Sequence, residues 1–443
     1  MLLGTVLNPI NSSILAVSLV PIGAALGAPP SETAWLVAAL YMATAVGQPV
    51  TGRLIDLFGP RRLYLAGMAL TGVAGLIGML APNLGVLILA RVLLGFGTCA
   101  GYPSAMYLIR SEGERTGRDS PAGVLTALAV SSQVMAVIGP SLGGLLIELG
   151  GWRTTLAVNL PLAVAGVVLG MRRLPRTPLP PRAPGERRMS RLDLPGVTLF
   201  SAMLISLLLF LMNPASTRWY LPVLSVAAAV CWVVRALRAP EPFLDLRVLA
   251  GNVPLLTTYC RALLAYVVGY AALYGYTQWL EEGRGLSAAH AGLLQLPLFA
   301  TAIVAATYSG RRSEIRGRLV VGAVVQVVAC LLLLLLDSHS AIWLLLVVAF
   351  AFGIPQGLNG LALQNAVYYQ SDRERTASSA GLLRTFTYVG AMITSCLTGL
   401  FFAERADTGG LHELALSMLG MAALFLLITV PDRALSGLGG RGA

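Results

Sequence analysis

Long apolar stretches separated by short polar loops are the feature that most constrains this chain. A helix that crosses a bilayer needs about 20 mainly apolar residues. Only 12% of the residues are charged, against roughly 25% in soluble domains, so the apolar surplus has to face lipid. We therefore predict an all-α integral membrane protein with fourteen transmembrane helices, near residues 2–26, 34–54, 62–81, 84–109, 122–148, 152–171, 194–213, 219–237, 252–280, 288–309, 318–336, 341–368, 377–403 and 412–430.

The basic residues, all of them arginine, are distributed unevenly over the predicted loops. Loops on the cytoplasmic side of a membrane carry an excess of basic residues. Twenty-four arginines fall in one set of alternate loops or in the C-terminal tail, and four fall in the other set: Arg153, Arg218, Arg284 and Arg405. This asymmetry predicts both termini in the cytoplasm. The lysine-free usage, rich in Ala, Gly and Arg, is typical of a bacterium with a GC-rich genome, so we expect the chain in a bacterial inner membrane. The net charge of +11 does not indicate a nucleic-acid partner, because the arginines form no single stripe.

The pattern G-R-x-x-[DE]-x-x-G occurs twice, at residues 52–59 and 310–317, with an offset of 258 positions. At the same offset Ser120-Pro121-Ala122-Gly123 corresponds to Ser378-Ser379-Ala380-Gly381, and Gly95 corresponds to Gly353. Repeated halves that enclose a site near the bilayer midplane are typical of transporters. We predict a six-helix bundle at 1–171, a cytoplasmic linker at 172–193, two inserted helices and a loop at 194–251, and a second six-helix bundle with a tail at 252–443.

Enzymatic and metal-dependent functions find no support in the sequence. The five cysteines lie inside apolar segments without C-x-x-C spacing, and the three histidines have no metal-ligand spacing. We find no catalytic dyad and no nucleotide-binding G-x-x-x-x-G-K-[ST] loop. We expect no catalytic residue, no metal and no cofactor, and an ATP-driven pump is disfavoured.

The loop after the second predicted helix, Gly52-Arg53-Leu54-Ile55-Asp56-Leu57-Phe58-Gly59-Pro60-Arg61-Arg62, is similar to the signature loop of the major facilitator superfamily. Within that superfamily the chain resembles the fourteen-helix drug:proton antiporters. The resemblance implies a cytoplasmic gate that latches the two halves, formed by Gly52, Arg53, Asp56, Gly59, Arg61 and Arg62 with Gly310, Arg311 and Glu314. The simpler interpretation is that Arg61 and Arg62 only anchor the loop on the basic side of the membrane.

Arg91 opens the element Arg91-Val92-Leu93-Leu94-Gly95-Phe96-Gly97, which resembles the R-x-x-x-G-x-G element of the same family. An arginine inside a span costs roughly 2.5–3.5 kcal/mol on insertion scales, so it normally faces the bundle interior or water. The resemblance implies a role in proton coupling. The alternative is an arginine that reaches back to the near interface.

Gly139-Pro140-Ser141-Leu142-Gly143-Gly144 is similar to the antiporter signature G-P-x-x-G-G, which is associated with exporters. Proline bends the helix, and we expect the glycines to allow close packing against a helix of the other half. The sequence departs from the family pattern at Met135, where a further glycine is usual. Gly151-Trp152-Arg153 with Asn159-Leu160-Pro161 resembles another element of the group.

The first predicted helix carries Asn11 where the family often has an aspartate. None of the acidic residues lies near the middle of a predicted span, whereas Arg91, Arg261 and Arg384 do. A lipophilic cation in a cavity of low dielectric needs a carboxylate partner, so a neutral or anionic amphiphile fits better. We predict a cavity lined by Asn11, Gln48, Gln133, Arg261, Tyr266, Tyr270, Gln356, Asn359, Arg384 and Tyr388. For single amides a bond between helices is the alternative; the aromatic residues from Tyr274 to Trp279 are expected at the membrane interface.

These features and the resemblance together predict a secondary-active exporter of hydrophobic or amphiphilic small molecules, working by alternating access and proton antiport. Its partners would be the small-molecule substrate, protons and the lipid bilayer, with the chain acting as a monomer. Two alternatives stay open: a translocator of an anionic lipid or natural product, and a membrane sensor on the same scaffold that transports nothing.

Overall fold

A computed structural model describes residues 2–105, 107–108, 122–175, 193–212, 216–239, 242, 246, 251–310, 314–370, 376–432 and 434–435. Within these ranges the regular structure is helical. The N-terminal group of helices comprises α1 (Leu2–Ala16), α2 (Leu19–Leu26), α3 (Pro30–Phe58), α4 (Pro60–Met79), α5 (Leu84–Thr98), α7 (Ala122–Gly150), α8 (Trp152–Ala157) and α9 (Asn159–Arg173). Next come α10 (Leu194–Met212), the 3₁₀ turn η2 (Ser216–Arg218) and α11 (Tyr220–Arg238). The C-terminal group comprises α13 (Val253–Glu282), α14 (Ala288–Gly310), α15 (Ile315–Leu333), α16 (Ile342–Gln370), α17 (Thr376–Phe401) and α18 (Thr408–Thr429).

Each predicted apolar segment coincides with a helix or with two consecutive helices. Among the described residues, 10 helices are long and apolar enough to cross a bilayer, and up to 11 if α1 and α2 form one bent span. These two helices meet at an angle of 58°. The break follows from Pro21, which has no N–H to donate to the carbonyl of Val17 four residues earlier.

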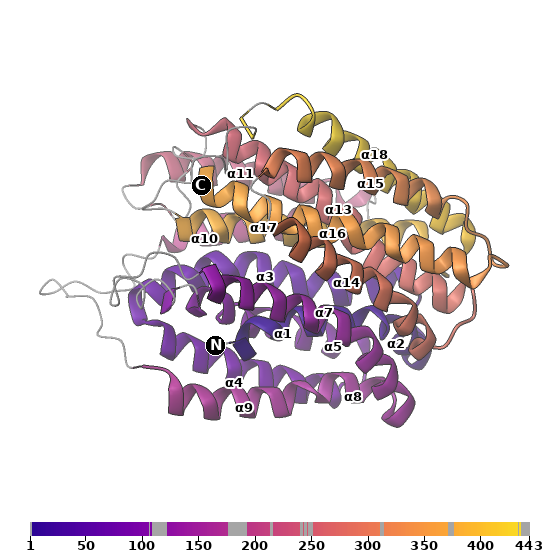
Figure 1. Cartoon of the computed structure of the whole chain (residues 1–443). Helices are drawn as coiled ribbons and strands as arrows, with labels where there is room; N and C mark the ends of the chain where they lie inside the picture. The colour runs from indigo at the N-terminus through magenta and orange to yellow at the C-terminus, as the bar shows by residue number, and fades with distance from the viewer. Residues whose placement is uncertain are drawn as a thin grey trace, which may run out of the picture.

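Helix packing repeats between the N-terminal and C-terminal groups. Within the N-terminal group α1 packs on α7, α3 on α5, and α4 on α5 and α9; within the C-terminal group α13 packs on α17, α14 on α16, and α15 on α16 and α18. The two groups meet along two seams, α3 with α17 and α7 with α14. Figure 1 shows the helices of the N-terminal group below those of the C-terminal group. The offset of 258 residues relates α3 to α14 and α7 to α17, so each seam is the counterpart of the other.

Two glycines show the same correspondence at the level of atoms. A Cβ added to Gly95 would lie 2.6 Å from the carbonyl oxygen of Leu40 and 2.7 Å from the Cβ of Ala43. A Cβ added to Gly353 would meet the carbonyl oxygen of Leu298 and the Cβ of Thr301. All three positions in the second set are those of the first set plus 258. The repeat therefore preserves the close approach of α5 to α3 in the close approach of α16 to α14.

Both described ends of the chain lie at one end of the bundle, which we call the proximal end (Figure 1). Gly4 contacts Gly101 there, and Arg316 donates to the carbonyl of Val430 over 2.6 Å. At the opposite, distal end, the N–H of Ser31 donates to the carbonyl of Ala403 over 3.2 Å. Since α3 begins at the distal end, residues 52–59 and the end of α14 at Gly310 lie at the proximal end together.

The inserted helices α10 and α11 pack against each other and rest on one seam. The ring centroids of Phe200 and Trp232 are 5.3 Å apart, and Arg235 pairs with Asp193 at 2.9 Å. Of these two helices, α10 contacts both α3 and α17.

Candidate functional site

Four tyrosines meet between the two groups of helices. The hydroxyl of Tyr41 in α3 lies 2.9 Å from that of Tyr274 in α13. The ring of Tyr41 lies 5.0 Å from that of Tyr270 and 5.5 Å from that of Tyr388 in α17, where the rings stack. Tyr266, Tyr270 and Tyr274 follow one another at four-residue spacing, which places them on one face of α13. An aromatic surface that can donate and accept hydrogen bonds thus lies where two groups of helices meet.

Arg384 of α17 lies half-buried beside this tyrosine cluster. Its guanidinium is 4.9 Å from the ring centroid of Tyr102, a residue of the N-terminal group, and Tyr266, Tyr270 and Tyr388 are also near it. Gln364 donates to the hydroxyl of Tyr102 over 3.3 Å. The structure therefore brings four of the predicted cavity residues together: Tyr266, Tyr270, Arg384 and Tyr388.

Tyr41, Tyr102 and Tyr274 belong to this cluster but were not predicted. The expectation that Tyr274, Tyr276 and Trp279 lie at the membrane interface is wrong, because they are 1%, 0% and 0% exposed. The four-residue spacing from Tyr266 and Tyr270 is the signal that could have placed Tyr274 in the cluster.

Arg91 of α5 is 2% exposed. It lies close to Tyr274 and Tyr41, and its Nε and Nη1 atoms have no hydrogen-bond partner in the part of the chain that the structure describes. This burial places the guanidinium in the bundle interior, against the alternative of a side chain that reaches the interface. It lies on the distal side of the cluster, and Arg384 on the proximal side.

Asn11 forms a reciprocal pair with Asn159, with Nδ2–Oδ1 distances of 2.7 and 2.9 Å. Asn11 also donates to the carbonyl of Leu7 over 2.9 Å. Its amide thus joins α1 to α9 and matches the alternative of a bond between helices. Gln48 lies close to Tyr388 of the cluster, and the side chain of Gln133 lies outside the described residues.

Arg261 lies apart from the tyrosines although it is on the same helix. It pairs with Asp432 at 2.5 Å and donates to the carbonyl of Ile428 over 2.8 Å. Position 261 is five residues before Tyr266, which turns it about 140° away at 100° per residue. Arg261 therefore ties α13 to the end of α18 at the proximal end.

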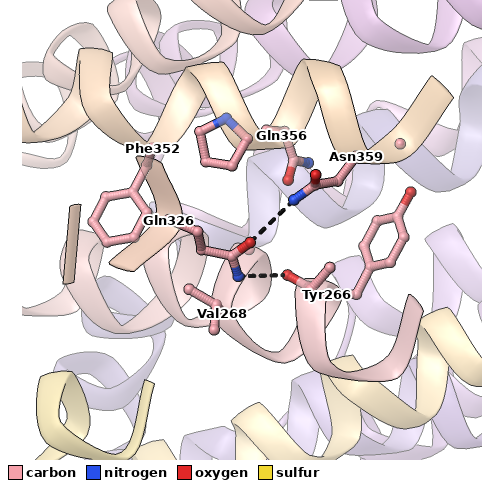
Figure 2. A pocket seen from close by; sticks show the side chains of 10 residues that line it. Tyr266, Val268, Gln326, Phe352, Gln356 and Asn359 are labelled. Carbon is pink, nitrogen blue, oxygen red and sulfur yellow. Dashed lines mark hydrogen bonds between the residues drawn. The ribbon is translucent and has the colours of Figure 1, made fainter. Parts of the chain in front are cut away.

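A small pocket between α13, α15 and α16 holds the predicted residues Gln356 and Asn359 next to Tyr266. Figure 2 shows Gln326 at its centre. Gln326 accepts from Asn359 over 3.1 Å and donates to the carbonyl of Ala265 over 3.3 Å. Gln326 is not among the cavity residues predicted from the sequence, although it lies in an apolar helix as Gln48 and Gln356 do.

The predicted gate is described only in part. The side chain of Asp56 and all of Arg311 lie outside the described residues, and Gly310 is described only as the end of α14. Gly52 and Arg53 lie in the last turns of α3. Gly59, between α3 and α4, has a φ of +84°, which favours glycine. Arg61 donates to the carbonyl of Met171 over 2.8 Å, Arg62 is exposed, and the carbonyl of Glu314 accepts from Arg318 over 3.0 Å.

The glycines near Pro140 contact two different partners. A Cβ added to Gly139 or Gly143 would meet Ser13 or Ile14 of α1, or Val17 directly after it, all within the N-terminal group. Only Gly144 faces the other group, where an added Cβ would lie 2.5 Å from the Cα of Ala289. The expectation that these glycines pack against the other half is therefore right for Gly144 and wrong for Gly139 and Gly143. Gly139 and Gly143 are four residues apart and share one face of the helix, whereas Gly144 is turned about 100° from Gly143.

No carboxylate is found at the level of the tyrosine cluster among the described side chains. The next acidic residue along α13 is Glu281, in the last turn of the helix. It is 7% exposed, and its Oε1 atom has no hydrogen-bond partner among those residues. They also contain no group of three or more metal-ligating side chains. The site is therefore aromatic and cationic at its centre, with one buried carboxyl towards its distal end.

The comparisons with known proteins agree with this architecture. The family model of the Major Facilitator Superfamily matches residues 1–395. The chain belongs to this superfamily. It is thus a multi-pass membrane transporter, and its family and relatives are transporters, not enzymes.

Relatives extend over nearly the whole chain. The MFS-type transporter YwoD of Bacillus subtilis is 29% identical over 437 residues, with 98% of this chain and 95% of that protein covered. The methylenomycin A resistance protein of the same organism is 23% identical, with 95% and 90% covered. The tetracenomycin C resistance and export protein of Streptomyces glaucescens is 26% identical, with 91% and 74% covered. Several relatives are thus named for resistance or export.

Solved structures share the fold at low identity. A structure from a study of proton dependent oligopeptide transporters has a TM-score of 0.68 at 14% identity, with 98% and 96% covered. The nucleoside transporter NupG has a TM-score of 0.60 at 12% identity, with 98% of each chain covered. At such identities the likeness concerns the fold alone.

Proposed function

We propose that this protein is a secondary-active exporter of hydrophobic or amphiphilic small molecules, driven by proton antiport. The observation that supports it most is the tyrosine cluster between the two groups of helices, flanked by Arg91 and Arg384. Tyrosine rings bind apolar bodies, and their hydroxyls satisfy polar groups. The relatives named for resistance to methylenomycin A and tetracenomycin C support export.

The charge of the cluster favours a neutral or anionic substrate. Two guanidiniums lie beside the tyrosines, and the described side chains at that level supply no carboxylate. Bringing a lipophilic cation there would place like charges together in a medium of low dielectric. An anionic headgroup beside Arg384, with the apolar body against Tyr266 and Tyr270, gains both kinds of contact.

Alternating access would then proceed by rocking of the bundle at 1–171 against the bundle at 252–443, with fourteen spans in all and both termini cytoplasmic. The proximal end would face the cytoplasm. Opening of the distal end would separate Ser31 from Ala403, Ser395 from the carbonyl of Ala34, and Tyr41 from Tyr274. We assign the monomer as the working unit.

The loop around Asp56 is proposed as the cytoplasmic gate, and Arg91 as part of the proton coupling. Replacing Asp56 by Asn should abolish export while the protein stays folded in detergent, because a neutral amide cannot hold the latch. If the Asp56→Asn variant exported at the wild-type rate, the role of this loop as a gate would be wrong.

A matched series of ligands tests the substrate class. Three amphiphiles with the same aromatic body and a carboxylate, a neutral amide or a quaternary ammonium headgroup would be titrated into the purified protein, with thermal unfolding as the readout. We expect the carboxylate to bind most tightly and the ammonium least. Arg384→Gln should weaken carboxylate binding roughly tenfold, equivalent to about 1.4 kcal/mol.

The control is Arg238→Gln, which removes an exposed arginine at the end of α11 and should leave binding unchanged. If the ammonium compound bound most tightly, the proposal of a neutral or anionic substrate would be overturned. A translocator of an anionic lipid or natural product is the second candidate, favoured by the Nε and Nη1 atoms of Arg91, which have no hydrogen-bond partner among the described residues. Stabilisation by an anionic phospholipid, but by none of the three amphiphiles, would favour that candidate.

A further inference from the structure

One face of α13 carries a continuous line of polar side chains. Tyr266, Tyr270, Tyr274 and Gln278 follow at four-residue spacing, and Glu281 comes three residues later. At 100° per residue, all five lie within an arc of about 120°. Tyr41 of α3 contacts this face through Tyr270 and Tyr274, so the line borders the space between the two groups of helices.

The distal end of this line is a buried carboxyl, that of Glu281 in the last turn of α13. Glu281 is 7% exposed and Gln278 is 2% exposed. The Oε1 atoms of both side chains have no hydrogen-bond partner among the described residues. Enclosing a carboxylate without a cation or a donor is costly, whereas a carboxylic acid is neutral and can donate to the amide oxygen of a neighbour such as Gln278.

The charged groups around Glu281 do not neutralise it. The adjoining Glu282 is the charge that acts on it, with the same sign. Arg405, in the loop between α17 and α18, binds the carbonyl of Glu282 over 2.9 Å, and Arg284 binds the carbonyl of Ser340 over 2.7 Å. His412 of α18 lies 2.8 Å from the carbonyl of Leu336. Each of these basic groups is thus engaged elsewhere.

Further acidic groups at this end are also directed elsewhere or lie in solvent. Asp407 accepts the N–H of Gly410 and caps α18, while Glu32 at the start of α3 and Glu413 of α18 are exposed. His290 of α14 interacts with Ser287. Glu282 itself accepts the N–H of Ala406 over 2.6 Å. Glu281 is therefore distinguished from its neighbour by burial and by its unsatisfied oxygen.

We propose that Glu281 is the carboxyl that binds the transported proton, loaded from the distal side. The inference rests on the proposed proton antiport and supplies the acid that antiport requires. In the conformation described here the site is closed and Glu281 holds its proton. When the distal end opens, the carboxyl meets water and takes up a proton from the outer compartment. After the distal end closes and the proximal end opens, that proton leaves towards the cytoplasm and the carboxyl is ready to be loaded again. The line of polar groups continues inwards through Gln278, Tyr274 and Tyr41.

The test compares Glu281→Gln with the wild type in proteoliposomes, with Glu282→Gln as the matched control. Two transport modes would be measured for the ligand that binds most tightly: accumulation driven by a pH gradient, and exchange of tracer at equal substrate and pH on both sides. We expect Glu281→Gln to lose the driven accumulation and keep the exchange, because glutamine mimics the protonated acid. Glu282→Gln should retain both modes.

An infrared measurement on purified protein gives a readout that needs no substrate. Wild type and Glu282→Gln should show a protonated carboxylic acid band at neutral pH that Glu281→Gln lacks. If Glu281→Gln fails to fold, Glu281→Asp, which keeps the acid but moves it by one methylene, should retain the band and shift the pH midpoint of transport.

The outcomes separate the two proposals. Driven accumulation by Glu281→Gln, or a band that persists in that variant, overturns the role of Glu281 and leaves the exporter standing. A wild type that exchanges substrate but ignores the pH gradient overturns proton antiport itself, and the role of Glu281 falls with it.

Discussion

Helices α1 and α13 occupy equivalent places in the repeat, yet they carry different chemistry. The positions of Tyr266, Tyr270 and Tyr274 in α13 correspond to Asn8, Ser12 and Ala16 in α1. In α1, Asn8 donates to Thr98 over 3.5 Å, and Ser12 donates to the carbonyl of Asn8 over 2.8 Å and lies beside Tyr41 and Tyr274. In α13 the tyrosines reach α3 of the other group.

The packing positions, by contrast, are shared. Gly95 and Gly353 sit against backbone at corresponding places, and the helix pairs repeat. Duplication therefore supplied a symmetric scaffold, and the candidate site lies mainly on one of its two copies. Three predictions test which contacts the two groups of helices share and which belong to one group alone.

The largest expected effect concerns Arg261, whose equivalent in α1 is Leu3. Arg261→Met should lower the free energy of unfolding by about 3 kcal/mol, because it leaves the carboxylate of Asp432 without its partner. Urea or thermal unfolding in detergent measures this. The double variant with Asp432→Asn should recover most of the loss. A single variant as stable as the wild type would show that the pair contributes nothing to the C-terminal group.

The next effect concerns the shared glycines. Gly353→Ala and Gly95→Ala should each cost about 1–3 kcal/mol, because the added Cβ meets the backbone of the neighbouring helix. Gly420→Ala in α18 is the control, since an added Cβ there has nothing within 4 Å. Thermal unfolding of the three variants gives the comparison. A Gly353→Ala protein as stable as Gly420→Ala would contradict the repeat of the closest approach.

The smallest effect concerns the hydrogen bond between Tyr41 and Tyr274. Each single change to Phe should cost about 1 kcal/mol, and the double change should cost less than the sum of the two. A double-mutant cycle measured by thermal unfolding isolates the coupling. Additive losses would mean that the 2.9 Å contact does not hold the two groups together.

The helices were predictable because their signal is local. An apolar run of sufficient length specifies a span, and the described basic residues Arg61 and Arg316 lie at the proximal end. The count of fourteen spans stays a prediction: among the described residues 10 helices are long and apolar enough to cross a bilayer, or 11 with α1 and α2 as one span.

The site was predictable only where a pattern exists within one helix. Tyr266 and Tyr270 were found, whereas Tyr274 was misassigned because its place near the end of an apolar run outweighed its spacing. Asp432 lies 171 residues after Arg261, and no local pattern announces such a partner. Glu281 was missed for a related reason: acids at the ends of apolar runs are usually exposed, and its burial depends on helices far away in the sequence.

The position of α10 has a consequence for how molecules dissolved in the lipid reach the transporter. Of the two seams, α10 rests against the one between α3 and α17. The seam between α7 and α14 has no comparable cover among the described helices, and Gly144 lies in it. The two seams therefore present different surroundings to a compound that diffuses within a leaflet: one is flanked by the pair α10 and α11, and the described helices leave the other without such a flank.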